Sequence, residues 1–187
     1  GWNVDGFDIP YLYNRSQQVV GKNVADCLSP ISSVYWNKYR ERYMIAGVSC
    51  LDYLMLYKNF TFSSKPSYRL DEIGKSEVGT AKISYDGTLN DLYENHLNDF
   101  VKYNIHDVRI VKKLDDKLDF IDVCRGICHV GHVPYEDIVY DSRFLEGAIL
   151  VYLKKLGVVA PNKAPRDDVK KDGKFAGAYV QDPQKGR

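Results

Sequence analysis

Three side chains stand out as groups that could do chemistry: the carboxylates of Asp8 and Asp107 and the phenol of Tyr103. Asp8 lies between Phe7 and Ile9 in the opening stretch GWNVDGFDIPYLYNR, and Tyr103 precedes Asp107 by one turn of a predicted helix. The phenol and the second acid can therefore reach one common point. Two acids from different elements can hold divalent cations through oxygen ligands when they converge. Such cations would activate water and stabilise the charge that develops in a phosphodiester displacement.

Simpler roles are open for both acids. Asp8 precedes a short predicted helix with Pro10 in its first turn, so it is well placed to cap that helix. Asp107 is expected to be shielded from water, and a shielded carboxylate can equally pair with a nearby lysine or arginine. Spacing alone favours these simpler roles.

The elements that must position these residues follow from local patterns. Residues 1–4 are typical of a strand end, and we expect helices over 8–21 and up to Gly79. The stretch rich in Tyr, Val and Ile predicts a hairpin with a polar tip near 37–41, a strand over 43–54, and a turn at 85–87. A long helix is predicted over 89–128 with at most one break, then a helix that ends at Gly157.

Periodicity predicts that the long helix packs on two sides. One apolar stripe contains Val101, Ile105 and Val108, and a second contains Phe100, Val111 and Leu114. A charged stripe contains Lys102, His106, Arg109 and Lys113. Asp107 lies away from that charged stripe, next to the second apolar one, which is why we expect it to be shielded.

Composition excludes several classes of protein. The 187 residues are 44% hydrophobic and carry a formal net charge of +1, which indicates neither a nucleic-acid partner nor a membrane. No apolar run is long enough to span a bilayer, and no signal peptide is visible. The four cysteines are too few and too scattered for a disulfide scaffold, so we expect free thiols and a cytoplasmic protein.

The same residues carry a resemblance to family B DNA polymerases. GWNVDGFDIPYLYNR resembles the second 3′–5′ exonuclease motif of that family, an Asn, a spacer and then Phe/Tyr-Asp. YNIHDV, at 103–108, resembles the third motif, a Tyr followed four residues later by Asp. The segments GVSCLDYLMLYKNF, KPSYRLDEIG and GKFAGAYVQDP also resemble the family in order and spacing, and the replicative polymerases of T-even-like bacteriophages are the most similar type.

The resemblance implies an α/β, ribonuclease H-like exonuclease domain that removes mispaired nucleotides from the single-stranded 3′ end of a DNA primer. It implies that Asp107 ligates the catalytic Mg²⁺ or Mn²⁺, that Asp8 serves the second metal, and that Tyr103 orients the attacking water. The family's first motif, an Asp-x-Glu on the central strand, and its polymerase motifs are not among the 187 residues. We therefore interpret the chain as an internal fragment with an incomplete α/β domain, a β-hairpin insertion and a helical C-terminal part.

The expected organisation is a partial exonuclease domain at 1–128, a helical extension at 129–159 and a linker towards the polymerase domain at 160–187. Expected partners are DNA, the missing N-terminal and polymerase portions and, through the parent protein, a sliding clamp. Exposed apolar faces also predict self-association, and the missing acids predict an inactive isolated chain. A viral parent would place the chain in the host cell cytoplasm.

Two further groups suggest other functions. Lys38, Arg40 and Arg42 lie at the hairpin tip, where the family separates primer from template, and they are candidate DNA contacts; a solvated turn is the alternative. Cys124, Cys128, His129 and His132 are crowded together and do not match the usual zinc spacing. The competing functions are therefore a nucleic-acid-binding fragment without catalysis and, less favoured, a zinc-dependent interaction module.

Overall fold

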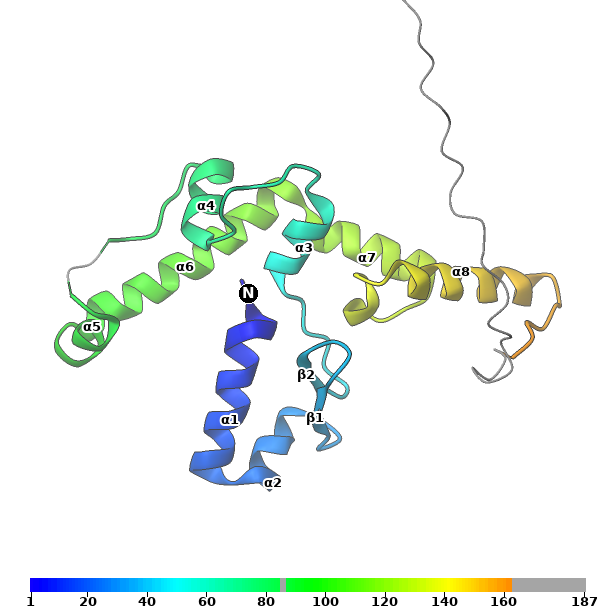
Figure 1. Ribbon diagram of the computed structural model, residues 1–187, viewed down its shortest axis with the longest axis horizontal. Helices are drawn as coiled ribbons and strands as arrows, with labels where there is room; N and C mark the ends of the chain where they lie inside the picture. The colour runs from blue at the N-terminus through cyan, green and yellow to red at the C-terminus, as the bar shows by residue number, and fades with distance from the viewer. Residues whose placement is uncertain (85–86, 163–187) are drawn as a thin grey trace, which may run out of the picture.

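A long row of helices runs along the length of the molecule, and an N-terminal arm and a hairpin project from it (Figure 1). The computed structural model describes residues 1–84 and 87–162. In chain order the elements are η1 (Val4–Asp8), α1 (Ile9–Val20), α2 (Lys22–Ala25), η2 (Asp26–Leu28), β1 (Val34–Asn37), β2 (Arg42–Ile45), α3 (Tyr53–Phe60), α4 (Leu70–Val78), α5 (Leu89–Asn95), α6 (Leu97–Leu118), α7 (Phe120–Gly131), η3 (Tyr135–Asp137) and α8 (Asp141–Lys155).

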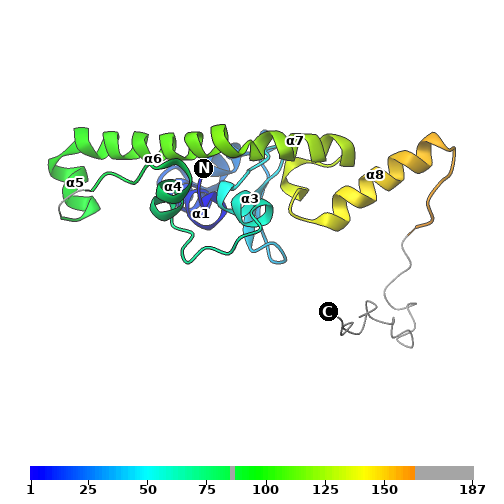
Figure 2. The same cartoon turned by 90° about the horizontal axis from the view of Figure 1, so that it is seen from above.

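The core lies where α3 and α4 pack against the junction of α6 and α7. Figure 2 shows α6 and α7 end to end, with α3 and α4 on one side of them. Leu56 and Tyr57 of α3, Ile73 of α4, and Ile110 and Leu114 of α6 are almost completely buried. These side chains fix the C-terminal half of α6 relative to α3, and so fix the surface on which Asp107 lies.

Several local predictions are confirmed. Pro10 lies in the first turn of α1, and Gly79 ends α4 in the left-handed conformation with φ of 63°. The antiparallel hairpin pairs Val34 with Ile45 and Asn37 with Arg42, which leaves 38–41 as its tip. Each of these features is set by residues close together in sequence, so local rules were enough to find them.

The strand predicted over 43–54 is wrong beyond Ile45, because Asp52 caps helix α3, which begins at Tyr53. Residues 1–4 form no strand either: Asn3 is left-handed with φ of 61°, and the π-helix η1 begins at Val4. In the described residues the only sheet is this two-stranded hairpin. The described residues are therefore mostly helical, and they contain no larger sheet.

The long helix is broken twice, not once, at His96 and at the left-handed Asp119. The prediction that it packs on two sides is wrong for this chain, since Val101, Ile105 and Val108 are 47%, 46% and 69% exposed. Packing by α4 buries the neighbouring face instead, through Ile110 and Leu114. An apolar stripe predicts a contact, but the partner for this one is not among the described residues.

The structure describes only part of the predicted C-terminal domain organisation. The predicted boundary at residue 128 falls inside α7, and residues 163–187 of the expected linker lie outside the described residues, as do 85–86 of the expected turn. The last helix, α8, ends at Lys155, with Gly157 in a left-handed conformation as expected at a helix end. No helix in the described ranges is both long and apolar enough to cross a bilayer.

The close packing of α7 on α8 gives a direct test of the fold. A Cβ added to Gly147 would overlap the carbonyl oxygen of Gly131, which is backbone and cannot turn away. We expect Gly147→Ala to lower the free energy of unfolding by about 2 kcal/mol. Gly126→Ala, on α7 with nothing within 4 Å of its new Cβ, is the control and should raise stability by about 0.5–1 kcal/mol. Urea unfolding measures both, and equal effects would contradict the described α7–α8 contact.

Candidate functional site

An open cavity of about 1290 Å³ separates the start of α1 from α6, and both predicted acids line it. Asp8 reaches it from the junction of η1 and α1, and Asp107 from the middle of α6. The structure therefore brings the two carboxylates to one cavity although they are far apart in sequence. Tyr103 is not among its lining residues, but it is joined to the site through a lysine.

Asp8 does not cap helix α1. Its side chain makes no capping hydrogen bond, because η1 runs directly into α1 and the Asp8 backbone is itself helical, with φ of −63° and ψ of −50°. Asp8 is exposed rather than shielded. The simpler capping role predicted for this residue is therefore wrong, and Asp8 is an exposed residue that lines the cavity.

Asp107 pairs with a lysine, as the simpler alternative predicted. Lys82 Nζ donates to Asp107 Oδ2 at 2.6 Å and to the Tyr103 hydroxyl at 3.0 Å. The other oxygen, Asp107 Oδ1, is buried and has no hydrogen-bond partner among the described residues. The carboxylate is thus half-buried and only partly satisfied, which is the state expected of a group with capacity for another ligand.

Lys82 is a site residue that the sequence analysis did not identify. Burial disfavours its ammonium, but the hydrogen bonds to Asp107 and Tyr103 outweigh burial and raise the pKa of Lys82 above its ordinary value. Its backbone N–H is donated to Asp71 Oδ1 at 2.6 Å, and the preceding Ala81 carbonyl lies 2.8 Å from His106 Nε2. No local sequence pattern predicts a contact between Lys82 and Asp107, which are 25 positions apart.

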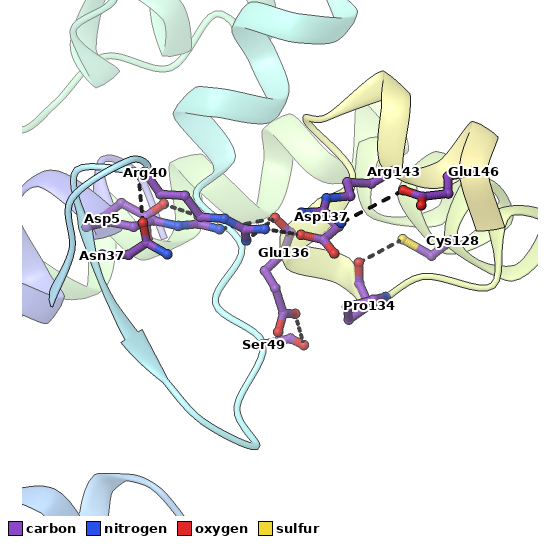
Figure 3. A network of polar contacts seen from close by, with 11 residues as sticks. Asp5, Asn37, Arg40, Ser49, Cys128, Pro134, Glu136, Asp137, Arg143 and Glu146 are labelled. Carbon is purple, nitrogen blue, oxygen red and sulfur yellow. Dashed lines mark hydrogen bonds and ion pairs between the residues drawn. The ribbon is translucent and has the colours of Figure 1, made fainter. Parts of the chain in front are cut away.

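The hairpin arginines form ion pairs within the chain (Figure 3). Arg40 pairs with Asp137 and lies 4.7 Å over the Tyr140 ring, while Arg42 Nη1 donates to Asp5 Oδ2 at 2.6 Å. Both guanidinium groups also donate to the Glu136 carbonyl, at 3.4 and 3.1 Å. These contacts brace the hairpin against η1 and η3, and they leave Lys38 exposed at the tip beside the fully exposed Tyr39.

The candidate zinc residues do not converge. Cys124 and Cys128 are buried in the core, whereas His129 and His132 are exposed, with rings 6.4 Å apart. Among residues 1–84 and 87–162, no three His, Cys, Asp or Glu side chains are placed to hold a metal ion. The same finding applies to the cavity: Asp8 and Asp107 are two ligands at most, and the described chain does not complete a metal site.

Comparison with known proteins shows which protein family the chain is similar to. Residues 1–73 match the model of the family described as "DNA polymerase family B, exonuclease domain", whose fold is ribonuclease H-like α/β. The predicted resemblance to family B DNA polymerases of phages is thereby confirmed.

Two phage enzymes extend the match to almost the whole chain. The DNA-directed DNA polymerases of Enterobacteria phage T4 and Escherichia phage RB69 are 35% and 34% identical to it, over 190 and 189 residues. Each match covers 98% of this chain but only 21% and 20% of the two polymerases. The chain therefore spans about a fifth of the length of these relatives.

The lysine–aspartate contact can be tested by a double-mutant cycle. Since Lys82 and Asp107 side chains are 32% and 22% exposed, we expect Lys82→Met and Asp107→Asn to be coupled by about 1 kcal/mol. The exposed pair Asp99–Lys102, on the same helix, is the control and should show about 0.3 kcal/mol. Urea unfolding of the two cycles provides the measurement, and no coupling at Lys82–Asp107 would contradict the described contact.

Proposed function

We propose that this chain contributes the second and third motifs of a 3′–5′ proofreading exonuclease within a longer DNA polymerase. In this proposal Asp8 and Asp107 hold Mg²⁺ or Mn²⁺, and Tyr103 orients the water that attacks the terminal phosphodiester. The observation that carries the proposal is that both acids line one open cavity, with Asp107 Oδ1 buried and without a partner. Carboxylate oxygens are the ligands that these hard cations prefer.

The charges at the site suit hydrolysis of a phosphodiester. When bound, the two metals would activate water and stabilise the negative charge that develops on the phosphate. Lys82 keeps its positive charge beside Asp107 and fixes the position of the Tyr103 oxygen through its 3.0 Å hydrogen bond. Its ammonium is thus placed to attract the DNA phosphate while the phenol is held on the same side of α6.

The remaining metal ligands belong, in this proposal, to the first exonuclease motif of the family. With two carboxylates alone, the isolated chain is expected to have little or no nuclease activity. The apolar face of α6 formed by Val101, Ile105 and Val108 would be covered by the rest of the parent protein, and in the isolated chain it favours self-association. The division at 128 and 159, a sliding-clamp contact of the parent and action in the host cytoplasm remain part of this proposal.

DNA contact at the hairpin is assigned mainly to its tip. Lys38 and Tyr39 are exposed there and can contact a phosphate and an unpaired base. Arg40 and Arg42 contribute by holding the hairpin in place, since their side chains are only 18% and 12% exposed and already paired with carboxylates. A primer 3′ end separated at this hairpin would then be directed to the cavity.

A second candidate is a DNA-binding segment without catalysis. It is favoured by the finding that the described residues contain no complete group of metal ligands. Under this alternative Asp107 serves only to pair with Lys82, and its carboxylate makes no difference to hydrolysis. The two proposals therefore differ in what removal of one negative charge does to nuclease activity.

The test uses a T4 polymerase in which this chain replaces the matching segment. We expect Asp107→Asn in that graft to lower the rate of 3′ digestion of single-stranded DNA by about 10³-fold, because the charge that holds the metal is lost. Polymerisation should be unchanged. The control is Asp99→Asn, on the same helix but exposed and paired with Lys102, which should leave both activities intact. Equal digestion by the Asp107→Asn graft and its parent would favour the binding-only alternative.

A further inference from the structure

Asp52 joins two parts of the chain that are far apart in sequence. Its side chain is 95% buried by the packing around it, since the residue is only 5% exposed. Oδ1 accepts from the Leu54 N–H at 2.9 Å, which caps α3, and also from the Asn3 N–H at 2.8 Å. Oδ2 accepts from the Asp5 N–H at 3.3 Å. One carboxylate thus satisfies backbone donors in both α3 and the N-terminal segment.

The start of the N-terminal segment is also attached to the core, where the Trp2 ring packs against Tyr53 and Tyr57. The Gly1 carbonyl accepts from the Tyr53 N–H at 2.9 Å, and the Trp2 indole donates to the Tyr68 carbonyl at 3.1 Å. Among the described residues, the side-chain hydrogen bonds that join residues 3–8 to parts of the chain beyond α1 are those to Asp52 and the ion pair of Asp5 with Arg42. Asp8 is the last residue of η1, within one turn of Asp5.

The left-handed backbone at Asn3 is also stabilised by a hydrogen bond to another part of the chain. Asn3 has a φ of 61°, a left-handed conformation that an L-residue adopts at some cost unless its surroundings hold it there. The Asn3 side chain folds back over Gly6, where a Cβ would meet Asn3 Oδ1 at 2.6 Å. The 2.8 Å bond from Asn3 N–H to Asp52 Oδ1 therefore stabilises the turn from which η1 starts.

We propose that Asp52 is a positioning residue for Asp8: besides capping α3, its carboxylate sets the place of η1 and so delivers the Asp8 carboxylate to the cavity shared with Asp107. The inference rests on the proposed function for the role of Asp8 as a metal ligand. It does not rest on that function for the link between Asp52 and the N-terminal segment, which consists of the two hydrogen bonds from Asn3 N–H and Asp5 N–H. Asp52 itself does not touch the reacting groups.

Two substitutions separate the link from the cap. Asn and Ser both cap helices well, so Asp52→Asn and Asp52→Ser preserve α3. The amide of Asn has a single acceptor oxygen, so it loses the bond from Asp5 and retains those from Asn3 and Leu54. The shorter Ser keeps the cap and loses both bonds to the N-terminal segment.

Amide hydrogen exchange in the 187-residue chain measures the link directly. We expect about tenfold faster exchange at Asp5 in Asp52→Asn, and at both Asn3 and Asp5 in Asp52→Ser, with α3 and α4 unchanged. Asp91→Asn, in the capping box of α5, is the matched control and should leave Asn3 and Asp5 unchanged. Unchanged exchange at Asn3 and Asp5 in the Ser variant, or an equal rise throughout the core, would overturn the inference.

Mn²⁺ titration followed by NMR distinguishes this inference from the proposed function. In the unsubstituted chain we expect the Asp8 and Asp107 amide signals to broaden together as Mn²⁺ is added. In Asp52→Ser the Asp107 signal should broaden as before, while the Asp8 signal requires about tenfold more Mn²⁺. Joint broadening in the Ser variant would overturn the positioning role of Asp52. Absence of broadening at both acids in the unsubstituted chain would show that these two carboxylates hold no Mn²⁺ without the first motif, and hydrogen exchange would then decide the link by itself.

Discussion

The arrangement of this chain depends on how its N-terminal segment is attached to the helical core. The Asp52 carboxylate bonds to the backbone of residues 3 and 5, and the Arg42–Asp5 ion pair ties the same segment to the hairpin. A buried carboxylate is stable only when its oxygens are satisfied, so the N-terminal segment and α3 each need the other. Through this attachment α1 and the hairpin are joined to the helical core, and they project from the row formed by α6 and α7 (Figure 1).

A second electrostatic constraint governs the other side of the cavity. Lys82 bonds to both Tyr103 and Asp107, so one ammonium group orders both of these α6 side chains. The pair satisfies Oδ2 of the Asp107 carboxylate and leaves Oδ1 buried, with no hydrogen-bond partner among the described residues. In the proposed function Oδ1 is the oxygen that meets the metal ion, while the bond from Lys82 to Oδ2 maintains the position of the carboxylate.

Local rules predicted several elements of the fold, but not the contacts around Asp8 and Asp107. Pro10, Gly79 and the hairpin tip were found because each is determined by its immediate neighbours. The strand predicted over 43–54 was wrong because Asp52 begins a helix, and a single acid in an apolar stretch does not reveal that it caps one. The Lys82–Asp107 pair and the exposure of Val108 depend on tertiary packing. The spacing of residues in one sequence does not show which side chains will meet in the folded chain.

The central claim is that Asp8 and Asp107 together face one cation-binding cavity. Crystals of the T4 polymerase that carries this chain, soaked in Mn²⁺, test it through the anomalous scattering of the metal. The account predicts a peak within coordination distance of Asp107 Oδ1, on the side of the cavity that faces Asp8, and its loss in Asp107→Asn. Mn²⁺ bound elsewhere with the cavity empty, or a peak that persists in Asp107→Asn, would contradict it.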